Sequence, residues 1–302
     1  MKDIRQEYLD KGYVIVPNLI SSAKIANFLG CLDELKKNDC LYYSQSEHNW
    51  RFIKSDLDKY GLISSSFQNF TNLIWARKLS KFGKMILLSK EINNILKILS
   101  DQERFCMWQN MLFDKSTGTL DHLDSWYLDT DPMGSLFGVW IALEDIDGKG
   151  GSFHVYPESH KESSNEWINK SHEDYVFWCN KLSSKYSKKE ALLNKGDVLF
   201  WHPSLLHGSS NQLIKGRSRK SLTAHYYPIN FLKGGSGINS NNDSLSYKNK
   251  LTMRNKSFKY LKYSIEMDRN FKWDLLFSFK GLLKYIINTN KPKFLMNRKN
   301  YF

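Results

Sequence analysis

The stretch Lys195-Gly196-Asp197-Val198-Leu199-Phe200, followed by Leu205-Leu206-His207-Gly208-Ser209, shows the pattern that decides the fold. Short apolar runs alternate with Gly, Pro, Asp and Ser, and this alternation extends from Phe105 to Tyr227. Many short runs of β-branched and aromatic residues with such punctuation are typical of a β-sandwich or barrel. Eight strands of this kind form a double-sheet jelly roll. The sequence therefore predicts a mainly β domain.

Helical spacing of apolar residues marks two segments before this region, residues 22–35 and 82–99. We expect helices there, flanking the β structure. At 302 residues the chain could form one large domain or two small ones. One domain over residues 1–230 is favoured, because the motifs described below are spread over most of that length.

Three side chains of the β region can bind one metal ion. His122 and Asp124 are two residues apart, so on a strand they would point to the same face, and His207 comes from a later strand. Two histidines and one carboxylate form a facial triad with three open positions, which suits non-haem Fe(II). Zinc would accept the same ligands. His202 and His225 are the rival third ligands, and we prefer His207 because His202 precedes a proline and His225 comes too late in the pattern.

Arg219 favours iron over zinc. An oxygenase of this type needs two electrons beyond those of its substrate, and a 2-oxo acid that chelates the metal can provide them by decarboxylation. The far carboxylate of that acid needs an anchor. The planar fork of Arg219 matches a carboxylate, and Ser221, at the same strand parity, adds a hydroxyl donor. Arg217 is the rival anchor, but it lacks a paired hydroxyl.

This ordered set of residues resembles the phytanoyl-CoA dioxygenase family of Fe(II)/2-oxoglutarate oxygenases. The resemblance covers about residues 10 to 230 and includes the segments 11–20, 108–112, 138–145, 150–160 and 195–200. Glu158 departs from it, because a glycine is usual there, and residues 161–190 form a polar segment like an insertion. The resemblance implies a double-stranded β-helix, the cupin-like jelly roll.

The resemblance also implies a function, that of a 2-oxoglutarate-dependent non-haem iron dioxygenase that consumes O₂. It implies iron on His122, Asp124 and His207, 2-oxoglutarate on Arg219 and Ser221, and a contact of Gln109 with the oxoacid. The expected reaction is hydroxylation of an unactivated C–H bond in a small organic molecule, such as a specialised metabolite or an amino-acid or sugar derivative. Halogenating relatives replace the carboxylate ligand by a small residue, so the presence of Asp124 argues against halogenation.

Alternatives to this interpretation remain open. One is a jelly roll that keeps a metal without turnover and binds a carbohydrate or small ligand. Another is a zinc hydrolase, which would not need Arg219. Trp126, Tyr127 and Asp129 follow the first ligands, and they either line the substrate pocket or pack the mouth of the barrel.

The positive charge of the chain is concentrated near its C-terminus. The net charge is +13, and residues 231–302 contain 15 Lys or Arg against 4 Asp or Glu, which is a net of +11. We expect this basic, partly helical extension to pack on the same domain. The amphipathic segment 271–288 could instead contact an anionic membrane surface. Nucleic-acid binding is not expected, because no zinc-finger, helix-turn-helix or RNA-binding signature accompanies the charge.

The compartment is predicted from the cysteines and from the N-terminus. The four cysteines show no metal-like spacing, and the first residues lack the apolar run of a signal peptide. A reduced, cytoplasmic protein fits these features. The sequence does not indicate an oligomeric state.

Overall fold

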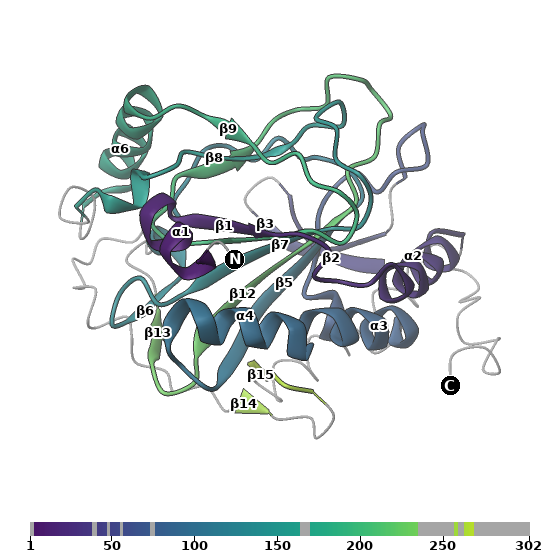
Figure 1. Cartoon of the computed structure of the whole chain (residues 1–302). Coiled ribbons are helices and arrows are strands. Elements are labelled where there is room, and N and C mark those ends of the chain that lie inside the picture. Colours follow the sequence, from purple (N-terminus) through teal and green to yellow (C-terminus); the bar gives the residue numbers. More distant parts are fainter. Residues whose placement is uncertain are drawn as a thin grey trace.

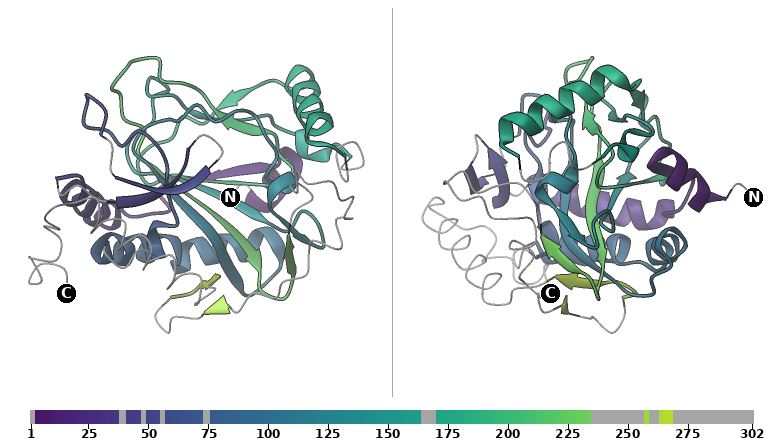
Figure 2. Two further views of the ribbon diagram at one scale, coloured as in Figure 1. Left: turned by 180° about the vertical axis from the view of Figure 1, so that it is seen from behind. Right: turned by 90° about the vertical axis from the view of Figure 1, so that its left-hand side faces the viewer.

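Two β-sheets with helices on their outer sides form the structure, a computed structural model (Figure 1). It describes residues 3–37, 41–46, 49–54, 57–72, 76–163, 170–234, 257–258 and 263–268. A large sheet lies in the middle. Helices α2, α3 and α4 lie on one side of it, while the small sheet and α6 lie on the other side (Figures 1 and 2).

The helices of the described residues differ widely in length. They are α1 (Ile4–Lys11), α2 (Ser22–Lys37), α3 (Arg77–Leu87), α4 (Lys90–Ser100), α5 (Asp124–Tyr127) and α6 (His172–Lys185), with 3-10 turns at Phe70–Asn72 and Ser159–Lys161. The segment 82–99 forms parts of two helices. A break falls between them because the Ser89 side chain caps α4 by accepting a hydrogen bond from the Ile92 N–H.

The large sheet has eight strands. Their order is β1 (Tyr13–Val16), β10 (Val198–Trp201), β7 (Phe137–Ala142), β12 (Ser221–Pro228), β5 (Phe105–Phe113), β15 (Glu266–Asp268) and β14 (Ser257–Phe258), and β4 (Phe67–Gln68) also pairs with β5. The small sheet has the order β11 (His207–Ser209), β8 (Phe153–Val155) and β9 (Lys189–Glu190). Two further pairs are β13 (Leu232–Gly234) with β6 (Asp129–Asp131), and β2 (Leu41–Ser46) with β3 (Asn49–Lys54).

Alternating side chains give the large sheet two different faces. In β12, Leu222, Ala224 and Tyr226 belong to the main hydrophobic core, which also contains buried residues of α2, α3 and α4. In β10 and β7, Trp201 and Trp140 belong to a second core shared with Phe153 of the small sheet. The sequence-based prediction of a jelly roll with flanking helices is confirmed, with one sheet much larger than the other.

Of the described parts of residues 231–302, β15 and β14 extend one edge of the large sheet, and β13 pairs with β6. Strand β15 pairs in parallel with β5, and its neighbour Ile265 lies in the main core. The amphipathic segment 271–288 lies outside the described residues. Among the helices described, none is long and apolar enough to cross a membrane.

Candidate active site

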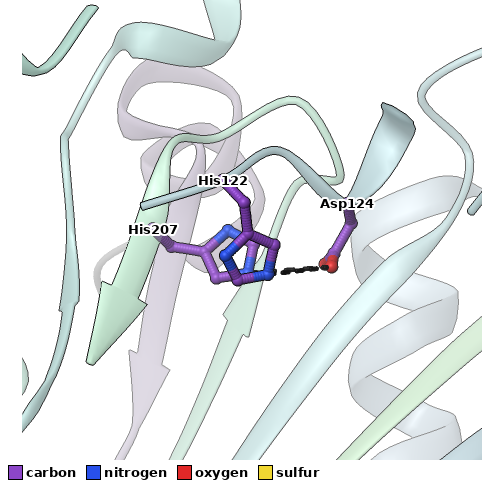
Figure 3. Close-up of side chains that lie close together, drawn as sticks. All are labelled: His122, Asp124 and His207. Atoms are coloured by element: carbon purple, nitrogen blue, oxygen red, sulfur yellow. Dashed lines mark ion pairs between the residues drawn. The ribbon is translucent and has the colours of Figure 1, made fainter. Parts of the chain in front are cut away.

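The structure brings His122, Asp124 and His207 together (Figure 3). One ligand atom from each lies within 4.8 Å of the other two. The Asp124 Oδ1 atom is 3.8 Å from His122 Nε2 and 3.7 Å from His207 Nε2. Among the described residues this is the group of His, Cys, Asp or Glu side chains that could hold a metal ion.

The backbone places His122 and His207 directly opposite each other on adjacent segments of the chain. His122 and His207 form an isolated antiparallel bridge in which each backbone N–H donates to the carbonyl of the other, at 2.9 and 3.1 Å. His207 begins β11 and is buried, whereas the His122 side chain is 25% exposed. The open side of the group is therefore beside His122.

The spacing predicted that Asp124 would lie on one strand with His122, and this prediction is wrong. Asp124 is the first residue of α5, and the chain turns after Leu123. The reason lies in the backbone: the Ser125 N–H donates to Pro203 O and the Leu128 N–H to Asp124 O, so neither is available to a neighbouring strand. The carboxylate still faces both histidines.

Both imidazoles are set to bind a cation. His122 Nδ1 is 2.8 Å from Leu120 O, and His207 Nδ1 is 2.8 Å from Leu205 O. A carbonyl only accepts, so each Nδ1 carries a proton, and Nε2 is the nitrogen of each ring that can coordinate a metal. Burial, followed by the nearby His122, lowers the pKa of His207 to about 3. This histidine is neutral at physiological pH, as metal binding requires.

The second oxygen of Asp124 is held from the large sheet. Trp201 Nε1 donates to Oδ2 at 2.8 Å, and His225 Nε2 lies 3.0 Å from the same atom. Gln109 Nε2 lies 3.1 Å from His225 Nδ1; as a donor there, it leaves the His225 proton on Nε2, facing Asp124. Burial opposes ionisation of Asp124, yet the neighbouring His225 keeps the pKa of the carboxyl well below its usual range.

Gly138 makes room for Trp201 in this arrangement. The two residues are partners in the register of β7 and β10. A Cβ atom on Gly138 would lie 2.0 Å from the Trp201 indole, which is closer than any real contact. A glycine is therefore needed here for the indole to reach Asp124.

Arg219 is a buried cation beside this region. It is 3% exposed, and its Nη1 donates to Ser221 Oγ at 3.1 Å. Its guanidinium carbon lies 5.6 Å from the centre of the Trp140 ring, which stacks on Phe153, and Phe153 in turn contacts the His207 ring. Burial lowers the pKa of Arg219 to about 10, so it stays charged at neutral pH.

No carboxylate of the described residues forms an ion pair with Arg219, and its Nε has no hydrogen-bond partner there. A buried charge of this kind is costly unless an anion accompanies it. The rival Arg217 is exposed and pairs with Asp147 at 3.0 Å. Of the two arginines, Arg219 alone is in a position to hold a buried anionic ligand.

The remaining residues predicted from the sequence do not all lie at the proposed metal site. Gln109 contacts His225, as described, and the rival ligand His202 packs near His160 and Tyr8. The candidate substrate residues differ in exposure: Trp126 is 2% exposed, Tyr127 is 37% exposed and Asp129 is fully buried. Asp129 Oδ1 accepts hydrogen bonds from the Thr130 and Gly134 N–H groups.

Two residues near the proposed ligands, Trp201 and Tyr175, were not singled out as functional from the sequence. His225 was considered there only as a rival metal ligand, and the structure instead places it against Asp124 Oδ2. His225 shares strand parity with Ser221, and Trp201 shares parity with Leu199 in β10, so the alternation could have placed both on the inner face. Tyr175 lies on α6 within the insertion-like segment, where no motif marks it. Its hydroxyl contacts the backbone of Leu123, between two of the ligands.

A double-stranded β-helix with a His-Asp-His site and a buried arginine defines a class of protein, the non-haem iron oxygenases that use 2-oxoglutarate. Comparison with known proteins narrows this class. The chain belongs to the phytanoyl-CoA dioxygenase family, whose model matches residues 8–220. This confirms the family, the fold and the Fe(II)/2-oxoglutarate class predicted from the sequence.

Curated relatives agree with this family. The chain is 25% identical to a phytanoyl-CoA dioxygenase domain-containing protein 1 homolog of Caenorhabditis elegans, over 74% of this chain and 90% of that protein. It is 24% identical to the peroxisomal phytanoyl-CoA dioxygenase of Bos taurus, over 75% and 68%.

Solved structures show the same fold at lower identity. The carbocyclase SnoK from nogalamycin biosynthesis aligns with a TM-score of 0.58 and 17% identity, over 80% of this chain and 88% of SnoK. EctD from S. alaskensis, solved with 2-oxoglutarate and 5-hydroxyectoine, aligns with a TM-score of 0.56 and 12% identity, over 88% and 87%. These likenesses support the fold.

Proposed function

We propose that this protein hydroxylates an unactivated C–H bond of a small organic substrate, with Fe(II), 2-oxoglutarate and O₂. In this reaction one oxygen atom enters the substrate and the other enters succinate, and CO₂ is released. The observation that carries the proposal is the geometry of the group: two imidazole nitrogens and one carboxylate oxygen converge, and each side chain is oriented by a further hydrogen bond.

Iron would be held by Nε2 of His122, Nε2 of His207 and Oδ1 of Asp124. When bound, it supplies the redox chemistry that couples oxidation of the oxoacid to oxidation of the substrate. The residues fit this role, because the histidine tautomers leave both Nε2 atoms free and Asp124 keeps its negative charge. Trp201 and His225 then fix the carboxylate so that only Oδ1 faces the ion.

The far carboxylate of 2-oxoglutarate would pair with Arg219. The Nε of the buried guanidinium has no partner among the described residues, and the Ser221 hydroxyl beside Nη1 is a second polar group for an anion. Gln109 is proposed to act on the same side of the site. Its contact with His225 supports a role in orienting that histidine, and a contact with the oxoacid remains a proposal.

The substrate is proposed to be a small molecule that enters beside His122, where the group is open. The structure solved with nogalamycin RO bound to SnoN and the EctD structure with 5-hydroxyectoine are of proteins with this fold. Trp126, Tyr127 and Asp129 are proposed to shape this entrance, and Tyr127 is the most exposed of the three.

The proposal is tested by oxygen consumption and succinate formation after anaerobic loading with Fe(II). The account predicts that O₂ uptake depends on 2-oxoglutarate and that one succinate forms per O₂. Protein loaded with Zn²⁺ is the matched control and should show neither. Full iron loading without any oxoacid-dependent O₂ uptake, across a panel of candidate substrates, would favour a binding module instead.

A further inference from the structure

Tyr175 of helix α6 contacts the backbone of the segment His122-Leu123-Asp124. The Tyr175 hydroxyl accepts a hydrogen bond from the Leu123 N–H at 2.8 Å and donates one to the Leu123 carbonyl at 3.2 Å. Leu123 is the residue between His122 and Asp124, and it is 1% exposed. A single side-chain atom therefore satisfies both backbone groups of the residue that joins two ligands.

Among the described residues, the other side-chain partner of the Leu123 backbone is the Cys179 thiol of α6, a weak acceptor for the N–H. Leu123 is the N-cap position of α5, and it has no side-chain cap because it is a leucine. Its carbonyl otherwise receives only a long contact of 3.3 Å from the Trp126 N–H. Without the hydroxyl, the buried N–H would keep only the weak thiol partner and the carbonyl only the long contact, so the tyrosine stabilises the shape of this turn.

The Tyr175 ring is itself fixed in place. It stacks on Trp126 with the ring centres 4.4 Å apart and an interplanar angle of 16°. It belongs to a hydrophobic cluster of α6 residues, which include Trp178, Cys179 and Leu182, together with Leu206 next to His207. Helix α6 begins with a capping box between Ser171 and Asp174, so its first turn is well defined.

We propose that Tyr175 is a positioning residue for the metal site. Its hydroxyl fixes the turn at Leu123, and this turn aims His122 and Asp124 at the same point. Helix α6, which lies in the insertion-like part of the sequence, then helps to support the proposed metal site. The inference rests on the proposed function, because it concerns the ion that His122, Asp124 and His207 would hold.

The test is metal affinity in Tyr175→Phe, which removes one hydroxyl and keeps the stacked ring. Anaerobic equilibrium dialysis gives the Kd for Fe(II), and the visible absorption of bound Co²⁺ reports the geometry of the ligands. Loss of a partner that orients a ligand typically weakens metal binding 10–100-fold, and we expect about tenfold here because the ligands themselves remain. The Co²⁺ spectrum should change as well.

Tyr186→Phe is the matched control. Tyr186 caps the other end of α6, and its hydroxyl donates to Glu162, away from the ligands. Its Kd should stay within about twofold of wild type. A Tyr175→Phe variant with lower thermal stability but the wild-type Kd and Co²⁺ spectrum would show a merely structural hydroxyl and overturn the proposal.

A second variant, Ser171→Ala, keeps the Tyr175 hydroxyl but removes the N-cap of α6. We expect a smaller loss of Fe(II) affinity, about twofold to fivefold, because the helix turn that carries Tyr175 is loosened. If Tyr175→Phe does not fold, an unchanged Kd in Ser171→Ala overturns the proposal. Wild-type protein that binds no Fe(II) would instead contradict the proposed function, so the two failures are distinguishable.

Discussion

The large sheet and the half of the molecule that carries the proposed metal ligands are built differently. In the large sheet, β12 pairs with β5 along its whole length and with β7 from Ser221 to Tyr226. In the other half, strands β8, β9 and β11 have only two or three residues, and His122 is held by a single bridge. Regular pairing fixes the first region, whereas contacts from distant segments fix the second.

The two regions also supply different parts of the site. Arg219 and Ser221, the proposed anchor of the oxoacid, are at the start of the regular strand β12. His122, Asp124 and His207 are in the irregular half, and their geometry depends on Tyr175, Trp201 and His225. We therefore expect 2-oxoglutarate binding to change when Arg219 or Ser221 is substituted. Metal binding should also change when residues that only orient the proposed ligands are substituted.

The largest expected effect separates the two regions. Arg219→Ala should raise the 2-oxoglutarate requirement tenfold to hundredfold and leave iron content intact, since a charge-assisted hydrogen bond contributes on the order of 1.5 to 3 kcal/mol. Arg219→Lys should recover only part of the lost 2-oxoglutarate affinity, because an ammonium lacks the planar fork. Arg217→Ala, at the exposed arginine, is the control and should titrate like wild type. A reduced iron content in Arg219→Ala would show that the oxoacid anchor and the metal site do not act independently.

The second prediction concerns His225, a residue of the large sheet that contacts a proposed metal ligand. His225 lies on the large sheet but contacts Asp124, so His225→Phe should weaken Fe(II) binding about tenfold without removing a ligand. His225→Gln, which can still donate to Asp124 Oδ2, should restore part of the affinity. Dialysis against Fe(II) measures both. Equal affinity in wild type and His225→Phe would mean that Trp201 alone orients the carboxylate.

A third prediction concerns pH and Asp129. Burial, with a smaller contribution from the charge of Asp124, raises the pKa of Asp129 to about 7, and its Oδ2 has no partner among the described residues. The folded protein therefore keeps a proton that the unfolded chain loses near pH 4, so this contribution to stability is lost as pH rises through about 7. Between pH 6 and pH 8 the free energy of unfolding should fall by about 1 kcal/mol.

Urea unfolding at the two pH values measures this change. Asp129→Asn carries no titrating proton and should lose that part of the pH dependence. If both proteins respond to pH equally, another group is responsible.

The smallest expected effect is at Glu158, where the family usually has glycine. The structure explains that preference, because Glu158 has a φ of 72°, in the left-handed region that favours glycine. Glu158→Gly should relieve strain of about 1 kcal/mol or more but add entropy to the unfolded chain, for a net gain of a few tenths to 1 kcal/mol. Thermal unfolding should show a slightly higher Tm. A lower Tm would mean that the glutamate side chain makes a larger contribution than the strain.

The sequence predicts the regular region better than the irregular one. Strand parity relates Ser221 to His225, and the alternation of β12 places Leu222 and Ala224 on the helix side. Motif order also brings His122, Asp124 and His207 together. The position of Asp124 on a helix, by contrast, depends on Pro203, which is 79 residues away, and the hold on Leu123 depends on Tyr175, so no local pattern contains either.

The most direct test of the account is the number of Fe(II) ions bound per chain by anaerobically purified protein. The account predicts one ion per chain in wild type near neutral pH and release on acidification, because the ligands must be deprotonated. His122→Ala and His207→Ala should each lose this binding. Full iron occupancy in both variants at neutral pH would contradict the assignment of His122, Asp124 and His207 as the metal site.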